Sequence, residues 1–226
     1  MASTNMINTQ IEPTNTTKTM RTLTKEMQDQ LTPAKALEIL KEGNKRFINN
    51  LKANRDLLKQ VNETSDGQHP FAVILSCIDS RTSAELIFDQ GLGDVFSVRI
   101  AGNCLNEDIL GSMEFACKVA GAKLIMVLGH SRCGAIKGAC DDVRMGNLTA
   151  LLNKLRPAVD DTKTSGDRKS TNSEFVEAVA HRNVDLTMDQ IPERSPILAE
   201  MIKEGSITIV GGMYDVQTGE VEFIRH

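Results

Sequence analysis

The most strongly apolar segments of this chain are two short runs. Residues 71–75 (FAVIL) and 123–128 (KLIMVL) have the length of a strand and show no polar alternation, a pattern typical of strands buried on both faces. Residues 95–100, 206–210 and 221–224 are rich in β-branched side chains and predict three further strands.

Between these strands, apolar residues recur at helical spacing. The pattern predicts helices over 82–89, 108–119, 134–145, 148–159, 173–190 and 196–204. In the second of these helices, Ile109, Met113 and Val119 are expected to face inward. The glycine pair at 211–212 is expected to end the fourth strand, and residues 215–219 to form a turn before the last one.

This order of elements predicts an α/β fold. Strands that alternate with helices form mostly parallel sheets covered by helices on both faces. We expect four parallel strands and a C-terminal antiparallel edge strand, which the short final turn would add as a hairpin. Nothing along the chain marks a second domain boundary or an internal repeat.

The N-terminal region divides into a polar tail and a helical arm. Residues 1–31 are rich in Thr and Asn and lack periodicity, so we expect a flexible tail, or alternatively an arm that packs on a partner subunit. A Thr-Pro pair at 32–33 predicts a helix start. Its apolar face begins with Leu37 and Leu40 and can dock on its own domain or on another subunit. Residues 32–226 are expected to form a single α/β domain.

Polar residues with metal-ligand chemistry follow both of the strongest strands. Cys77, Asp79 and Arg81 come directly after the first, and His130 and Cys133 follow the second. Ligands of open α/β sheets bind at the carboxyl ends of the strands. Zinc prefers sulfur and nitrogen ligands, and three of them leave a fourth position for water, as in catalytic sites. The pattern predicts a zinc ion on Cys77, His130 and Cys133.

Asp79 has two alternative roles in such a site. It can fill the fourth position, which would close the site and make the zinc structural. Alternatively, Arg81 can hold the carboxylate away from the metal through charge-assisted hydrogen bonds, which leaves Asp79 free to accept a hydrogen bond from zinc-bound hydroxide. A thiol redox pair of Cys77 and Cys133 without metal is a further alternative, disfavoured because no Cys-x-x-Cys motif is present.

Composition limits the classes of binding partner and the cellular compartment that we expect. The net charge is −4 without a long basic block, Trp is absent and Tyr214 is the single tyrosine, which argues against a nucleic-acid partner. No apolar run is long enough to span a bilayer, so we expect no membrane partner. The five cysteines follow no secretory signal and predict free thiols in the cytoplasm; Cys104, Cys117 and Cys140 are expected in the core.

Three segments resemble the signature motifs of one enzyme family. CIDSR (77–81), GHSRCGA (129–135) and GGMYDVQTG (211–219) resemble the β-class carbonic anhydrases. The resemblance implies one Zn²⁺ per subunit, held by Cys77, His130 and Cys133, with Asp79 and Arg81 as catalytic partners. It implies reversible hydration of CO₂ to bicarbonate and a proton by attack of zinc-bound hydroxide. A CS₂ or COS hydrolase on the same site and a non-catalytic zinc-binding module remain alternatives.

The resemblance also implies substrate contacts and an assembly. Gln68 matches a residue that binds bicarbonate across a dimer interface, Phe96 matches an aromatic wall of a small apolar pocket, and the backbone N–H of Gly134 matches a substrate contact. The family forms homodimers with exchanged N-terminal helices, often paired into tetramers. Ile74 stands where members with a second, inhibitory bicarbonate site carry Trp, so we expect an uninhibited enzyme with an open metal site.

Overall fold

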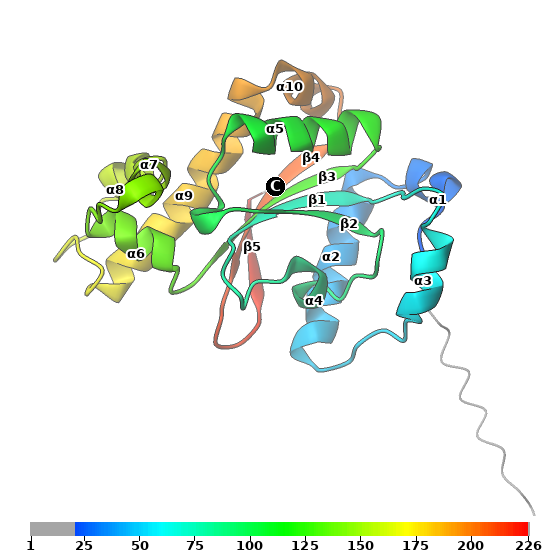
Figure 1. Cartoon of the computed structure of the whole chain (residues 1–226), viewed down its shortest axis with the longest axis horizontal. Helices are drawn as coiled ribbons and strands as arrows, with labels where there is room; N and C mark the ends of the chain where they lie inside the picture. Colours follow the sequence, from blue (N-terminus) through cyan, green and yellow to red (C-terminus); the bar gives the residue numbers. More distant parts are fainter. Residues whose placement is uncertain (1–20, 226) are drawn as a thin grey trace, which may run out of the picture.

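One five-stranded sheet forms the centre of the protein (Figure 1). The computed structural model describes residues 21–225. Its strands lie in the order β2-β1-β3-β4-β5, where the first four are parallel and β5 is antiparallel to β4. Their bounds are β1 Ala72–Ser76, β2 Val95–Arg99, β3 Leu124–His130, β4 Thr208–Tyr214 and β5 Val221–Arg225. The predicted fold class, four parallel strands with an antiparallel edge strand, is confirmed.

Helices cover both faces of this sheet (Figure 1). One apolar core lies between the sheet and helices α5, α6, α8, α9 and α10, and a second lies between the sheet and helices α2 and α4. The helices are α1 Lys25–Asp29, α2 Pro33–Ile48, α3 Leu57–Glu63, α4 Ala84–Ile87, α5 Glu107–Glu114, α6 Gly134–Cys140, α7 Gly146–Asn153, α8 Arg156–Asp161, α9 Ser173–Arg194 and α10 Pro196–Lys203. No helix among residues 21–225 is both long and apolar enough to cross a bilayer.

The two central strands position the chemistry of the chain. Every residue of β1 and β3 is buried, as their uninterrupted apolar runs predict. The strands are parallel neighbours in register, with Ser76 opposite Leu128. Cys77 after β1 and His130 at the end of β3 therefore reach the same edge of the sheet.

The structure corrects the boundary of the expected N-terminal tail. Residues 1–20 lie outside the described part of the chain, but α1 falls within the range predicted to be flexible. Gln28 of this helix is fully buried, and its amide donates to the carbonyls of Pro70 at 2.7 Å and Ala120 at 2.8 Å. These contacts are distant in sequence and leave no periodic signal. Helix α2 begins after Thr32 as predicted, and it packs on the sheet of its own chain.

The glycine pair does not end the fourth strand, contrary to the sequence prediction. Strand β4 runs through both glycines to Tyr214. A Cβ on Gly211 would lie 2.6 Å from Sδ of Met188, and one on Gly212 would lie 2.6 Å from Cε of Met126. The glycines are thus explained by close packing on both faces of the strand.

Three predicted helices also differ from the structure, and the one expected over 134–145 ends at Cys140. The segment 148–159 forms the end of α7 and the start of α8, and the break precedes Pro157, near the start of the second helix. The segment after α5 is a π-helical turn, η2 (Phe115–Val119). A π turn holds more residues than an α turn, so Val119 rotates outward and is 72 % exposed instead of buried.

Candidate metal centre

Cys77, His130 and Cys133 form one buried cluster at the carboxyl edge of the sheet. Their ligand atoms all lie within 4.8 Å of one another, and the two Sγ atoms are 3.9 Å apart. Cys77 directly follows β1, His130 is the last residue of β3, and Cys133 is the N-cap residue of α6. The structure thus brings together the three residues that the sequence predicts as metal ligands.

The cluster fits zinc by three observations. Two thiols and an imidazole are a known zinc donor set, and two sulfurs about 2.3 Å from a tetrahedral zinc would be about 3.8 Å apart, close to the 3.9 Å found here. Nδ1 of His130 lies 3.0 Å from the carbonyl oxygen of Ser131, to which it can donate. Nε2 is buried and has no hydrogen-bond partner among the described residues. A carbonyl oxygen that accepts from one ring nitrogen, and so leaves the other nitrogen free for a metal, is typical of metal-binding histidines.

The two thiols influence each other's ionisation. The contact with Cys133 lowers the pKa of Cys77 to about 4, and the N–H of Gly102 donates to its Sγ at 3.3 Å. The same contact, together with burial, raises the pKa of Cys133. The pair therefore holds one thiolate readily, but it needs a nearby cation to lose its second proton. A coordinated metal ion supplies that positive charge. Both thiols are free of disulfide bonds.

Arg81 holds Asp79 outside this cluster. Nε of Arg81 donates to Oδ1 of Asp79 at 2.9 Å, Nη2 donates to Oδ2 at 2.7 Å, and the backbone N–H of Arg81 donates to Oδ1 at 3.0 Å. The hydrogen bonds from Arg81 keep the pKa of Asp79 below its usual value, so the carboxylate stays charged. Asp79 is not among the clustered ligand atoms. In the structure, Asp79 therefore pairs with Arg81 and lies apart from the ligand cluster.

Two further side chains hold the turn between Cys77 and Asp79. Arg99, the last residue of β2, donates to the carbonyls of Cys77 at 3.0 Å and Asp79 at 2.7 Å. The buried hydroxyl of Thr82 lies 3.0 and 2.8 Å from the same two carbonyl oxygens. Sequence reasoning did not assign either residue to the site. Arg99 ends a parallel strand next to β1, so applying the strand-end rule to β2 would have found it.

The expected substrate residues are spread more widely. Gly134, the first residue of α6, is exposed next to Cys133, and a Cβ added to it would meet no atom within 4 Å. Phe96 of β2 lies opposite Val73 of β1 and packs edge-on against Phe115, with 6.2 Å between ring centroids. Gln68 is exposed and precedes β1, at the opposite end of that strand from Cys77. Within one chain, Gln68 is therefore separated from the metal cluster.

Comparisons with known proteins agree with this geometry. Residues 72–221 match the family model described as carbonic anhydrase. Carbonic anhydrase 2 of Mycobacterium tuberculosis is 37 % identical over 206 residues, which cover 86 % of this chain and 94 % of that protein. The carbonic anhydrase of Mycolicibacterium smegmatis is 34 % identical over 201 residues, with the same coverage of 86 % and 94 %.

A solved structure gives the class of the fold. It belongs to a study of two tetrameric β-carbonic anhydrases of the ascomycete Sordaria macrospora. It superposes with a TM-score of 0.63 at 24 % identity and covers 74 % of this chain and 89 % of that one. This structural match supports the fold, while the sequence relatives and the family model support membership of the family. Together they show that the chain belongs to the β-class carbonic anhydrase family, a family of enzymes.

Proposed function

We propose that this enzyme catalyses the zinc-dependent, reversible hydration of CO₂ to bicarbonate and a proton, with one Zn²⁺ held by Cys77, His130 and Cys133. One observation carries the proposal: two thiols and an unpartnered imidazole nitrogen converge in a buried cluster, while the neighbouring carboxylate is held outside it. Three ligands with an open fourth position are the arrangement of catalytic zinc.

Each residue of the proposed site has a distinct task. Zinc, when bound, supplies a Lewis acid that makes a bound water acidic near neutral pH. Asp79, charged and fixed by Arg81, accepts a hydrogen bond from the nucleophilic water and so orients the lone pair that attacks CO₂. The backbone N–H of Gly134, at the N-terminus of α6, donates to the developing carboxylate.

Completion of the pocket requires self-association. We propose a homodimer, or a pair of dimers, in which Gln68 of one subunit reaches the metal centre of its partner and Phe96 lines the CO₂ pocket. Strand β2 is an edge of the sheet, and Phe115, which packs on Phe96 of this strand, is 53 % exposed. Exposed apolar groups beside an edge strand favour an interface between subunits. The tetrameric β-carbonic anhydrases of S. macrospora support the same inference. We place the enzyme in the cytoplasm, where its five free thiols stay reduced.

Stopped-flow CO₂ hydration at alkaline pH tests the proposal when zinc is measured on the same sample. We expect rapid hydration with one zinc per chain. The Cys133→Ser variant should lose both zinc and activity, because it removes one of three ligands. One tightly bound zinc without CO₂ hydration would refute the proposed reaction and favour a structural metal.

A further inference from the structure

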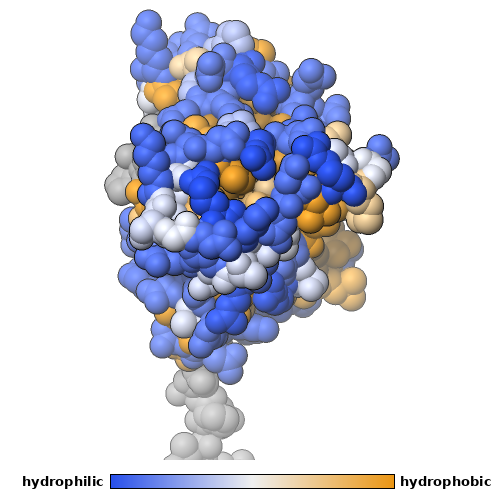
Figure 2. Space-filling view, turned by 90° about the vertical axis from the view of Figure 1, so that its left-hand side faces the viewer, coloured by the Kyte–Doolittle hydropathy of each residue, from blue (hydrophilic) through white to orange (hydrophobic). Residues whose placement is uncertain are grey.

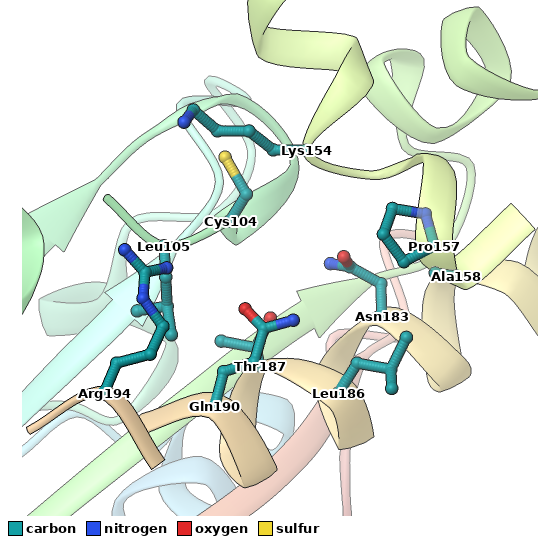
Figure 3. A pocket seen from close by; sticks show the side chains of 10 residues that line it. All are labelled: Cys104, Leu105, Lys154, Pro157, Ala158, Asn183, Leu186, Thr187, Gln190 and Arg194. Atoms are coloured by element: carbon teal, nitrogen blue, oxygen red, sulfur yellow. The ribbon is translucent and has the colours of Figure 1, made fainter. Parts of the chain in front are cut away.

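A polar pocket apart from the metal centre lies between α9 and the loop of Cys104 and Leu105 (Figure 3). It has a volume of about 160 Å³, which is ample for a small ion and ordered water. Its walls come from Lys154 at the end of α7, from α8 and α9, and from the segment after η1 (Ala101–Asn103). In Figure 3, Arg194 and Gln190 extend from α9 towards the loop of Cys104, and Lys154 lies across from them.

The charges of this pocket have one sign. Lys154 and Arg194 line it, and no Asp or Glu does. Both cations are exposed, and neither forms an ion pair with another described residue. Most other arginines in the same part of the chain are paired, as Arg156 is with Asp160. Two unpaired cations that share one hollow, without a neutralising carboxylate in its lining, favour an anionic ligand.

A threonine with no hydrogen-bond partner among the described residues is a second, independent observation. Thr187 is only 4 % exposed, yet its hydroxyl has no hydrogen bond to any other described residue, although it lines the pocket. The hydroxyl is not among the described side-chain atoms that are both buried and unpaired, so it is accessible from the pocket and available to a ligand. Asn183 and Gln190 add amide groups from the same helix. The pocket thus combines two cations with neutral hydrogen-bond donors.

We propose that this pocket binds a small oxyanion, such as inorganic phosphate or bicarbonate, at a site separate from the metal centre. Lys154 and Arg194 neutralise the charge, and Thr187 donates to an oxygen of the ligand. The side of the molecule that carries α6, α7 and α8 is mostly hydrophilic, with apolar patches near its centre and at the right of the view (Figure 2). A solvent-facing position leaves the pocket accessible to a small soluble ion.

The pocket is physically connected to the metal centre. The amide of Asn183 donates to the carbonyl of Gly102 at 2.9 Å, and the N–H of Gly102 donates to Sγ of Cys77 at 3.3 Å. Gly102 has a φ of +70°, a backbone conformation that other residues rarely adopt. An oxyanion that contacts Asn183 therefore acts one hydrogen bond away from the turn that contacts a metal ligand.

Calorimetric titration of inorganic phosphate into the zinc-loaded enzyme, in low-salt buffer, tests the proposal. We expect saturable binding of one phosphate per chain at millimolar concentration. The double variant Lys154→Gln/Arg194→Gln should weaken binding about tenfold or more, because each lost cation removes a close Coulomb interaction. Thr187→Val, which keeps the side-chain shape, should weaken it by about threefold. The matched control Lys52→Gln/Lys203→Gln removes two exposed cations elsewhere and should change affinity by less than about twofold.

Backbone amide shifts locate the bound ion and distinguish its source. Phosphate should shift the amides of Cys104, Thr187 and Gly102 in the wild type and not in the double variant. A parallel titration with bicarbonate identifies the reaction product as the ligand if the same amides respond at lower concentration than with phosphate. The proposal is overturned if no saturable binding occurs at tens of millimolar of either ion. It is equally overturned if the double variant binds like the wild type, or if only amides beside His130 respond.

Discussion

Replacing Arg81 by glutamine tests whether this arginine holds Asp79 in its active position. The side chain of Arg81 supplies two of the three hydrogen bonds that fix the carboxylate, from Nε at 2.9 Å and Nη2 at 2.7 Å. The variant keeps only the backbone N–H bond to Oδ1 at 3.0 Å. Oδ2 then loses its arginine donor, and Asp79 is free to turn towards the cluster of Cys77 and His130.

The expected size of the effect follows from what each variant leaves in place. Asp79→Asn removes the charged acceptor itself, and loss of a positioned acid or base typically costs 10²–10⁴-fold, so kcat/KM should fall at least about 100-fold. Arg81→Gln keeps the carboxylate and one of its three hydrogen bonds, so we expect a smaller loss of about tenfold. Both variants should retain one zinc per chain, because neither residue belongs to the ligand cluster.

The assay is stopped-flow CO₂ hydration with zinc measured for each protein. Arg132→Gln is a matched control, since Arg132 is also exposed, lies within the second motif and donates to Gln217 at 2.8 Å. It should retain activity within about twofold of the wild type. Wild-type activity in Arg81→Gln would refute the positioning role, and so would equal losses in Arg81→Gln and Arg132→Gln.

Three further substitutions test the framework of the site. Asp89→Asn should destabilise the fold by about 3 kcal/mol, because the buried carboxylate pairs with Arg46 at 2.5 Å and Arg55 at 2.6 Å; thermal melting should show a decrease of about 6–10 °C. Burial raises the pKa of Asp89, but hydrogen bonds from Arg46 and Arg55 outweigh this effect, so the net pKa is lowered. The difference in unfolding free energy between wild type and Asp89→Asn should therefore be full above about pH 4 and shrink below it. A difference that stays constant with pH would contradict this. Thr82→Val should cost about 1 kcal/mol in chemical denaturation and lower kcat/KM, since its hydroxyl holds two turn carbonyls; unchanged stability and rate would exclude that role. Gly102→Ala should weaken zinc affinity about tenfold in a chelator competition, because its Cβ would lie 2.7 Å from Cδ1 of Leu155; wild-type affinity would show that the turn adapts.

The parts of the fold that sequence predicts well are those that local pattern determines. The runs at 71–75 and 123–128 are apolar throughout, and burial on both faces is the physical reason. Because each run ends directly before potential ligands, the strand-end rule also places Cys77 and His130 together. These inferences need only the order of residues and the parallel pairing of two strands.

The errors involve contacts between distant segments. Gln28 orders α1 through carbonyls 42 and 92 residues away, which no local pattern records. Gly211 and Gly212 are required by the sulfur and methyl groups of Met188 and Met126, although a glycine pair usually indicates a break. The π turn that exposes Val119 likewise has no counterpart in a 3.6-residue period.

The support of the site was missed for a similar reason. Arg99 and Thr82 contact carbonyl groups rather than ligand atoms, and Asn183 reaches Gly102 from a helix 81 residues further along the chain. Such residues carry no motif of their own. They become visible once the hydrogen-bond partners of the turn between Cys77 and Asp79 are traced in three dimensions.

Zinc titration into chelator-treated enzyme, followed by stopped-flow CO₂ hydration at alkaline pH, tests the central claim most directly. If Cys77, His130 and Cys133 hold the catalytic metal, the metal-free protein is inactive. Activity then rises in proportion to added zinc and reaches a plateau at one zinc per chain. Full hydration activity in the metal-free protein, or a fully zinc-loaded protein without activity, would contradict the account.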